Sequence, residues 1–321
     1  MPKAALHNLG CKVNAYETEA MEQQLKERGY EIVPFDEKAD VYIINTCSVT
    51  NIADRKSRQM LHRAKKLNPE SVVVAAGCYV QVASEELKKD ASVDIVIGNN
   101  KKAELADILD EYLGNVHEEE EAEVFVTDLS HGSDYEALHL EQPSDHTRAF
   151  IKVQDGCDQF CSYCIIPYLR GPYRSVPMEQ LLAEARELAE NGVRELILVA
   201  QETTLYGTDI YGKKSLHLLL KELCKIKGIR WIRVQYCYPE EIYDELIQTM
   251  KEEPKVCNYL DLPIQHASDR ILKRMGRRTT QAELVEIVNK LRREIPDIVL
   301  RTTLISGFPG ETQEDHEELM G

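Results

Sequence analysis

The sequence has little Trp or Phe, no long apolar run and no excess of positive charge. One of its 321 residues is Trp and five are Phe. No apolar stretch approaches the roughly 20 residues that span a bilayer, and Met1-Pro2-Lys3 leads directly into a strand pattern without a secretory leader. We therefore expect a cytoplasmic protein that makes no contact with a membrane. The net charge of −16 argues against a protein that coats nucleic acid broadly.

Cysteine is more informative, because nine residues without an export signal argue against a disulfide framework. Three of them form a C-x3-C-x2-C loop after the apolar run 149–153, and we call Cys157, Cys161 and Cys164 the loop triad. Thiolates this close suit one soft metal centre. Three ligands with no fourth cysteine nearby predict a four-iron cluster with one iron open to a second molecule. Tyr163, just before the last ligand, is placed to lie against a planar ligand of that cluster.

A structural zinc site is the alternative that these residues leave open. Zinc in such sites usually takes four ligands, often from two C-x2-C pairs, and one such pair is present here. A chain that bound zinc through its thiols would be a non-catalytic scaffold. Brown colour would exclude that alternative, and a colourless zinc-loaded protein would support it.

The first part of the chain, residues 1–114, alternates apolar strand patterns with helical periodicity. Strands are expected at 4–9, 41–45, 72–76 and 93–97, and helices at 15–28, 53–67 and 103–113. Apolar strands separated by helices of this length predict an α/β domain with a parallel sheet covered on both faces.

Three of these strands end directly in cysteine, and we call Cys11, Cys47 and Cys78 the strand-end triad. The carboxyl ends of parallel strands lie along one edge, so thiols distant in sequence can meet there. Glycine before Cys11 and Cys78 allows a tight turn. The pattern predicts a second cluster. The alternative is that the strand-end triad merely packs, as we expect of Cys224, Cys237 and Cys257.

A linker is expected at residues 115–146, which include the acidic run 118–121 and one short strand at 124–127. Regular alternation then resumes over residues 147–321. Strands are expected at 149–153, 195–200, 230–235, 258–262 and 298–305, and helices at 178–190, 215–226, 240–252, 280–294 and 313–320. Repeated βα units predict a partial (β/α) barrel whose site lies at the strand carboxyl ends.

Polar residues mark that end of the predicted barrel. Gln154, Gln201, Gln235 and Gln265 each lie at or just past a strand end, which suggests a rim that orients a ligand by hydrogen bonds. Gly307, in the loop after the fifth strand, would let a ligand approach the backbone. The residues expected to contact the cofactor are Tyr163, Gln201, Gln265, Ser268 and Gly307.

The loop triad resembles the motif of radical S-adenosylmethionine (SAM) enzymes, and both triads together resemble the methylthiotransferases of that superfamily. The resemblance implies one 4Fe–4S cluster on each triad, with SAM bound to the open iron at the loop triad. It also implies that one electron splits SAM to a 5′-deoxyadenosyl radical, and that two SAM molecules serve to convert an unactivated C–H to C–SCH3. An electron donor such as flavodoxin or ferredoxin is then expected, since the chemistry belongs to the cofactors.

Two branches of that family are represented in the sequence. The stretches 9–17, 45–51 and 153–157 resemble enzymes that modify N6-threonylcarbamoyladenosine at tRNA position 37, whereas 198–207 and 261–268 resemble those that methylthiolate an aspartate of a small-subunit ribosomal protein. We expect tRNA, at C2 of the modified adenine, as the main substrate, and the aspartate β-carbon as the alternative. Family members typically carry a sixth βα unit and a C-terminal RNA-binding TRAM domain. Neither is visible, so a truncated chain is expected.

Overall fold

The computed structural model describes residues 1–115, 121–129, 135–143 and 147–321. Among these residues, no helix combines the length and the apolar character needed to cross a membrane. The chain forms two units. The first comprises the described residues of Met1–Ser144 together with Ile165–Pro172, and the second comprises those of Asp145–Cys164 together with Tyr173–Gly321.

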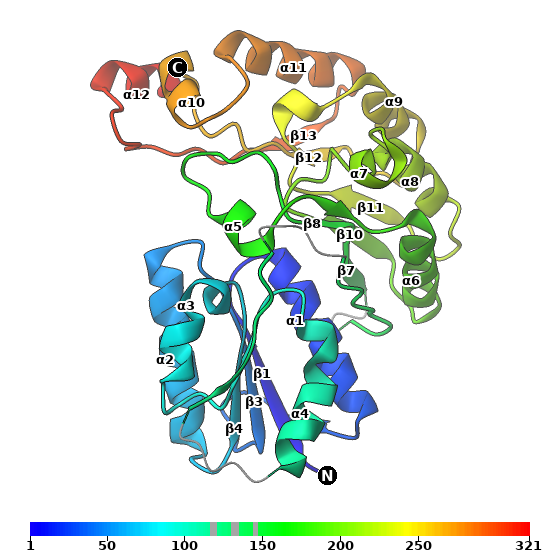
Figure 1. The fold of residues 1–321 in the computed structure, drawn as a ribbon. Helices are drawn as coiled ribbons and strands as arrows, with labels where there is room; N and C mark the ends of the chain where they lie inside the picture. The colour runs from blue at the N-terminus through cyan, green and yellow to red at the C-terminus, as the bar shows by residue number, and fades with distance from the viewer. Residues whose placement is uncertain (116–120, 130–134, 144–146) are drawn as a thin grey trace. The chain divides into compact units, whose positions relative to one another are not determined.

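The first unit is a parallel sheet with helices on both faces (Figure 1). Its strand order is β2-β1-β3-β4-β5-β6. The strands are β1 Lys3–Asn8, β2 Glu31–Ile32, β3 Val41–Thr46, β4 Val72–Gly77, β5 Ile95–Ile97 and β6 Glu123–Phe125. The helices are α1 Lys12–Glu27, α2 Asn51–Leu67, α3 Cys78–Lys88, α4 Leu105–Gly114 and α5 Ile166–Arg170, with a 3-10 turn η1 at Lys102–Glu104. The predicted α/β class with a parallel sheet is confirmed.

Strand β3 shows why both faces of this sheet are covered. All six of its residues are buried. Tyr42 and Ile44 join the core under α2 and α3, whereas Val41 and Ile43 join the core under α1 and α4. Because successive side chains of a strand point to opposite faces, a continuous apolar run requires helices on both sides.

Helix α3 was not among the predicted elements, and α1 begins three residues earlier than expected, at Lys12 rather than at residue 15. Both helices start directly at a cysteine of the strand-end triad, with Cys11 as the N-cap of α1 and Cys78 as the first residue of α3. The valines that open α3 favour extended backbone in isolation, so the sequence pattern there does not separate it from β4.

The described part of the predicted linker packs on the first unit. Strand β6 pairs with β5, and the hydroxyl of Tyr16 donates to the carbonyl of Leu138 at 2.9 Å. Residues 116–120, 130–134 and 144–146, which include most of the acidic run 118–121, lie outside the described residues.

The second unit is a partial barrel of parallel strands with its helices outside (Figure 1). Strands β7, β10 and β11 form one sheet in the order β11-β10-β7, and β12 pairs with β13. Their bounds are β7 Arg148–Lys152, β10 Glu195–Val199, β11 Trp231–Val234, β12 Tyr259–Asp261 and β13 Val299–Arg301, with a short antiparallel pair β8 Gln154–Asp155 and β9 Arg174–Ser175. The helices are α6 Met178–Glu190, α7 Thr208–Tyr211, α8 Leu216–Cys224, α9 Asp244–Glu252, α10 Asp269–Arg274, α11 Gln281–Glu294 and α12 Gln313–Met320, with η2 at Pro239–Glu241.

Candidate metal centres

The strand-end triad gathers because β1, β3 and β4 are neighbours in the first sheet. Each cysteine follows the carboxyl end of one of these strands, which brings the three thiols to one edge. A side chain at Gly10 would place its Cβ 2.8 Å from the sulfur of Cys47, and Gly10 has φ +106°. Gly77 before Cys78 has φ +95°. The predicted need for glycine at these two turns is confirmed.

Burial and a nearby cation have opposite effects on the pKa of thiols in the strand-end triad. Cys47 and Cys78 are buried and Cys11 is half-buried. Burial raises the pKa of Cys11 and of Cys47, and the guanidinium of Arg170 counteracts that rise at both sites. A bound metal removes the thiol proton outright, so these groups become strong ligands despite their burial.

A buried charge network stands behind the strand-end triad. The guanidinium of Arg170 donates to both carboxylate oxygens of Glu17, at 2.7 and 3.1 Å, and to Oδ1 of Asn14 at 2.8 Å. Lys102 pairs with the same Glu17 and also donates to Oδ1 of Asn99 at 2.8 Å. The side chains of Arg170, Glu17 and Lys102 are all at most 1% exposed.

This network reaches the sulfur atoms themselves. Oδ1 of Asn14 lies 3.8 Å from the sulfur of Cys11, and Nδ2 of Asn99 lies 3.7 Å from that of Cys78. The guanidinium of Arg170 opposes the rise in the pKa of Cys11 and of Cys47, and so favours thiolates at these positions. The surroundings of the strand-end triad therefore include a cation that suits a negatively charged centre.

The loop triad is held by backbone contacts of the second unit. Nε2 of Gln154 donates to the carbonyls of Asp155 and Gly156, and its Oε1 accepts the N–H of Gln201 at 3.1 Å. The N–H of Ser162 donates to the carbonyl of Met275 at 2.9 Å. These bonds shape the loop before any metal is bound.

The thiols of the loop triad are shielded from water. Cys157 and Cys161 are 6% and 4% exposed, and Cys164 is half-buried. Burial, reinforced by the charges of Glu202 and of the other two thiols, raises the pKa of Cys157 to about 12. Such a thiol ionises on binding a metal rather than by itself.

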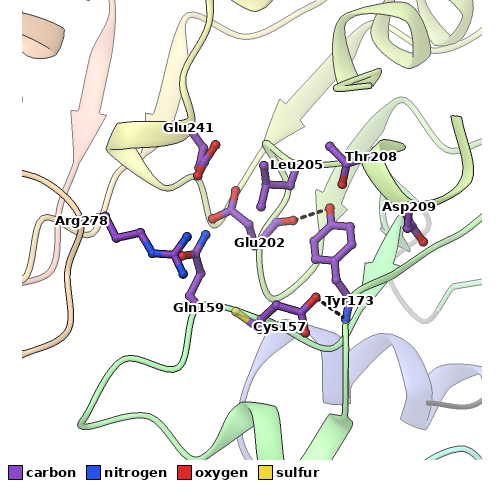
Figure 2. Close-up of a pocket in the computed structure, with 10 residues that line it drawn as sticks. Cys157, Gln159, Tyr173, Glu202, Leu205, Thr208, Asp209, Glu241 and Arg278 are labelled. Atoms are coloured by element: carbon purple, nitrogen blue, oxygen red, sulfur yellow. Dashed lines mark hydrogen bonds between the residues drawn. The ribbon is translucent and has the colours of Figure 1, made fainter. Parts of the chain in front are cut away.

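A cavity of about 340 Å³ opens beside Cys157 (Figure 2). Tyr173 crosses it, with its hydroxyl donating to the carbonyl of Glu202 at 3.0 Å and its N–H to Asp158 at 3.3 Å. The lining is acidic, with four carboxyl groups against one guanidinium. Its residues are Cys157, Asp158, Gln159, Tyr173, Glu202, Leu205, Thr208, Asp209, Glu241 and Arg278.

Glu202 stands out in this lining because it is fully buried. Burial raises its pKa well above the usual range, with Glu241 and Glu240 adding to the rise against Thr204 and Arg277. One carboxyl oxygen accepts the N–H and hydroxyl of Thr204, and the other has no partner among the described residues. A neutral carboxylic acid with a free oxygen can donate or accept one hydrogen bond in the cavity.

The five residues predicted to contact a cofactor occupy different environments. Tyr163 lies within electrostatic range of Cys161, and Oε1 of Gln201 is buried without a partner among the described residues. Gln265 has φ +69° at an isolated bridge to Leu304. Ser268 donates its hydroxyl to Asp315 at 2.7 Å, and Gly307 has open space around it. None of the five lines the cavity beside Cys157, and their role as cofactor contacts stays a prediction.

The glutamine rim is partly wrong. Gln154 is fully buried and uses its side chain on neighbouring backbone, so it shapes the loop instead of facing a ligand. Gln235 is 7% exposed, and its Oε1 has no partner in the described part of the chain. The sequence pattern indicates where a strand ends, but it does not indicate whether a glutamine side chain there faces the backbone or a ligand.

The spacing of the sulfur atoms bears on which metal fits. A single tetrahedral zinc holds its sulfurs ~3.8 Å apart, given a Zn–S bond of ~2.3 Å. Across the described ranges, no three cysteine sulfurs lie within 4.8 Å of one another. A four-iron cluster binds each thiolate to a separate iron and spaces them more widely. The described cysteine sulfurs therefore do not already stand at the spacing that a single zinc ion requires.

Sequence reasoning missed the charged groups around both triads. Glu17 and Lys102 stand among other polar residues in the sequence, and Arg170 follows only a short apolar run, so no local pattern pointed to them. Glu202 follows the predicted rim residue Gln201 directly, and its burial could not be read from the pattern.

Comparison with known families matches two regions of the chain. Residues 3–98 match the family described as "Uncharacterized protein family UPF0004", and residues 151–321 match the "Radical SAM superfamily". The chain is 48% identical over 316 residues to the ribosomal protein uS12 methylthiotransferase RimO of Lachnoclostridium phytofermentans, covering 97% of this chain and 70% of that protein. It is 44% identical over 322 residues to RimO of Geobacter sulfurreducens, covering 99% and 71%.

Solved structures support the fold at much lower sequence identity. The radical SAM methyltransferase TsrM of Kitasatospora setae, solved with tryptophan and a SAM analogue, matches with a TM-score of 0.68 and 16% identity over 100% of this chain and 70% of its own. The cobalamin-dependent radical SAM enzyme OxsB matches with a TM-score of 0.65 and 12% identity over 100% and 51%. At these identities the similarity concerns the fold alone.

The expected division of the chain between two branches finds no support. The RimO relatives from L. phytofermentans and G. sulfurreducens align across both halves, including the stretches 9–17 and 45–51 that resemble the tRNA branch. The two stretches contain Cys11 and Cys47 of the strand-end triad.

Proposed function

Because the chain belongs to the methylthiotransferases of the radical SAM superfamily, we propose that it methylthiolates a carbon of ribosomal protein uS12. The substrate atom is the β-carbon of an aspartate, as the stretches 198–207 and 261–268 suggest. The sequence-based preference for tRNA lacks support, since the relatives RimO of L. phytofermentans and of Clostridium perfringens are named for the ribosomal protein.

The observation that carries this choice of substrate is the acidic lining of the cavity beside Cys157. Asp158, Asp209 and Glu241 face it together with the buried Glu202, against the single base Arg278. Phosphates are bound by basic groups, so an acidic cavity disfavours a tRNA backbone. A ribosomal protein, which must itself bind RNA, carries basic segments that suit both this cavity and a chain of net charge −16.

We propose that each triad holds one 4Fe–4S cluster and that SAM binds at the loop triad. When bound, the cluster and SAM supply a radical that removes hydrogen from an unactivated carbon, which acid–base groups cannot do. At the strand-end triad, the guanidinium of Arg170 supports a second, negatively charged centre, because it opposes the rise in the pKa of Cys11 and of Cys47 and binds Asn14, which contacts the sulfur of Cys11.

The chain's own residues fix the loop triad in place and shield it from water. Gln154 fixes the backbone that leads into the loop triad, and burial of Cys157 and Cys161 keeps water from the centre. Burial raises the pKa of Glu202 and so favours its neutral form, whose free oxygen can offer a hydrogen bond without adding charge. Reduction requires an external donor such as flavodoxin or ferredoxin, which we propose for a protein acting in the cytoplasm.

Anaerobic reconstitution followed by mass spectrometry tests this function. The reconstituted chain is incubated with SAM, dithionite, sulfide as the sulfur source and either purified uS12 or unmodified tRNA. We expect one hydrogen of uS12 to be replaced by SCH3 and the tRNA nucleosides to stay unchanged. A chain with Cys157, Cys161 and Cys164 all replaced by alanine is the matched control and should give neither product. Modification of tRNA without modification of uS12 would contradict the proposal.

The zinc scaffold is distinguished in the same preparation. Iron–sulfur clusters absorb visible light, so a brown protein with stoichiometric sulfide supports the enzyme. A colourless protein that retains zinc and excludes iron under reconstitution would instead support the scaffold.

A further inference from the structure

Three side chains of the second unit, which the proposed function does not use, form a series of contacts that ends at the sulfur of Cys161. The hydroxyl of Tyr238, which follows β11, lies 3.0 Å from that sulfur. The guanidinium of Arg277, which follows α10, lies 4.1 Å from the centre of the Tyr238 ring. Glu240, in η2, accepts a hydrogen bond from Nη2 of Arg277 at 2.9 Å.

The direction of the hydrogen bond to Cys161 follows from its chemistry. A cysteine that ligates a metal is a thiolate and can only accept. A tyrosine hydroxyl ordinarily ionises only at about pH 10, so it keeps its proton at neutral pH. Tyr238 is therefore the donor whenever Cys161 holds a metal.

Burial and an ion pair hold the side chain of Arg277 against the Tyr238 ring. Its side chain is fully buried, and its pairing with Glu240 satisfies one nitrogen. Nε and Nη1 have no hydrogen-bond partner among the described residues. A buried cation with spare donors, stacked on the ring whose hydroxyl contacts Cys161, favours additional negative charge at the loop triad.

We propose that Tyr238 and Arg277 are positioning residues that raise the reduction potential of the iron–sulfur centre at the loop triad. A hydrogen bond to a ligand sulfur and a nearby positive charge both stabilise the reduced centre, which carries one more electron than the oxidised centre. One electron enters from an external low-potential reductant, and no bond forms or breaks in this step. The inference rests on the proposed function only in requiring a cluster at this triad.

The test is a redox titration of the reconstituted full chain, followed by electron paramagnetic resonance. Tyr238→Phe removes the donor and keeps the ring that Arg277 stacks on. We expect its ratio of reduced to oxidised centre to fall about tenfold at a fixed reductant potential, or about 59 mV for a one-electron couple. Iron content and melting temperature should match those of the unsubstituted chain.

Two further variants make the result specific. Arg277→Lys keeps the charge but loses the flat face that stacks on Tyr238, so a smaller shift in the same direction is expected. Tyr243→Phe is the matched control: Tyr243 lies near His217, with its hydroxyl 3.1 Å from Nδ1 of that ring, and should show no shift.

The outcomes separate this inference from the proposed function. If the unsubstituted chain binds no iron, the proposed function itself fails. If it binds iron and Tyr238→Phe has an unchanged potential, this inference alone is overturned. Loss of iron from Tyr238→Phe at an unchanged melting temperature would also overturn it, by showing that the hydroxyl retains the centre instead of setting its potential.

Discussion

Nη1 of Arg170 lies 2.7 Å from Oε1 of Glu17, although 153 residues separate the two in the sequence. Both side chains are 1% exposed, and Lys102 shares the same carboxylate. Arg170 comes from α5, six residues after Cys164, yet it belongs to the first unit and lies beside the strand-end triad. The segment that follows one triad thus supplies a charge to the other.

Replacing Arg170 by Met should destabilise the first unit and weaken metal binding there. Loss of one member of a buried ion pair typically costs about 3–5 kcal/mol, and both Glu17 and Asn14 would lose a hydrogen-bond donor. Chemical denaturation and iron analysis measure the two effects. Arg55→Met, at an exposed position of the same unit, is the control and should change neither. Equal stability and equal iron content in both variants would show that Arg170 neither stabilises the first unit nor supports metal binding there.

Gly10→Ala should disturb the strand-end triad directly. A Cβ at this position would lie 2.8 Å from the sulfur of Cys47, and φ +106° adds strain of about 1–2 kcal/mol for a residue with a side chain. We expect lower stability and about half the iron per chain. Gly114→Ala has nothing within 4 Å of the new methyl group and ends a helix, so it should keep full iron. Full iron in Gly10→Ala would show that the Cys47 sulfur need not sit where the structure places it.

Glu202→Gln should become relatively more stable as pH rises. The folded-state pKa of Glu202 is raised by burial, so its contribution is complete below the unfolded value of about 4.3 and is lost as pH rises through the folded value. Glutamine cannot ionise and escapes that loss. The melting temperature of Glu202→Gln relative to that of the unsubstituted chain should therefore be higher at pH 8 than at pH 5. The exposed Glu318→Gln serves as the control, and a parallel pH dependence in all three proteins would rule out a neutral Glu202.

Substitutions in the two triads should affect different steps of the reaction. Cys157→Ala should abolish 5′-deoxyadenosine formation from SAM, whereas Cys47→Ala should retain it and lose only transfer of the methylthio group to uS12. Chromatography of the nucleoside and mass spectrometry of uS12 report the two steps independently. Cys257→Ala, a half-buried cysteine outside both triads, should retain both. Methylthiolation by Cys47→Ala would mean that the strand-end triad merely packs.

The meeting of the strand-end cysteines could be predicted because it depends on a local pattern. Each apolar strand ends in a thiol, and parallel strands place their carboxyl ends on one edge. That β1, β3 and β4 are adjacent could not be read, since strand order is a property of the whole sheet.

The surroundings of the triads could not be predicted because they depend on contacts between distant segments. Helix α5 has five residues, too few to show periodicity, and Arg170 finds its partner across 153 residues. Tyr238 and Cys161 are 77 residues apart and come from different loops. The interpretation of Gln154 was wrong for a related reason. The local sequence indicates that it lies at a strand end, but the direction of its side chain depends on contacts with other segments.

Iron and sulfide analysis of three reconstituted proteins tests the central claim, that each triad holds its own cluster, most directly. The unsubstituted chain should bind about eight irons, four for each cubane, and a chain lacking either triad should bind about four. Four irons in the unsubstituted chain, unchanged when Cys11, Cys47 and Cys78 are replaced by alanine, would contradict the account.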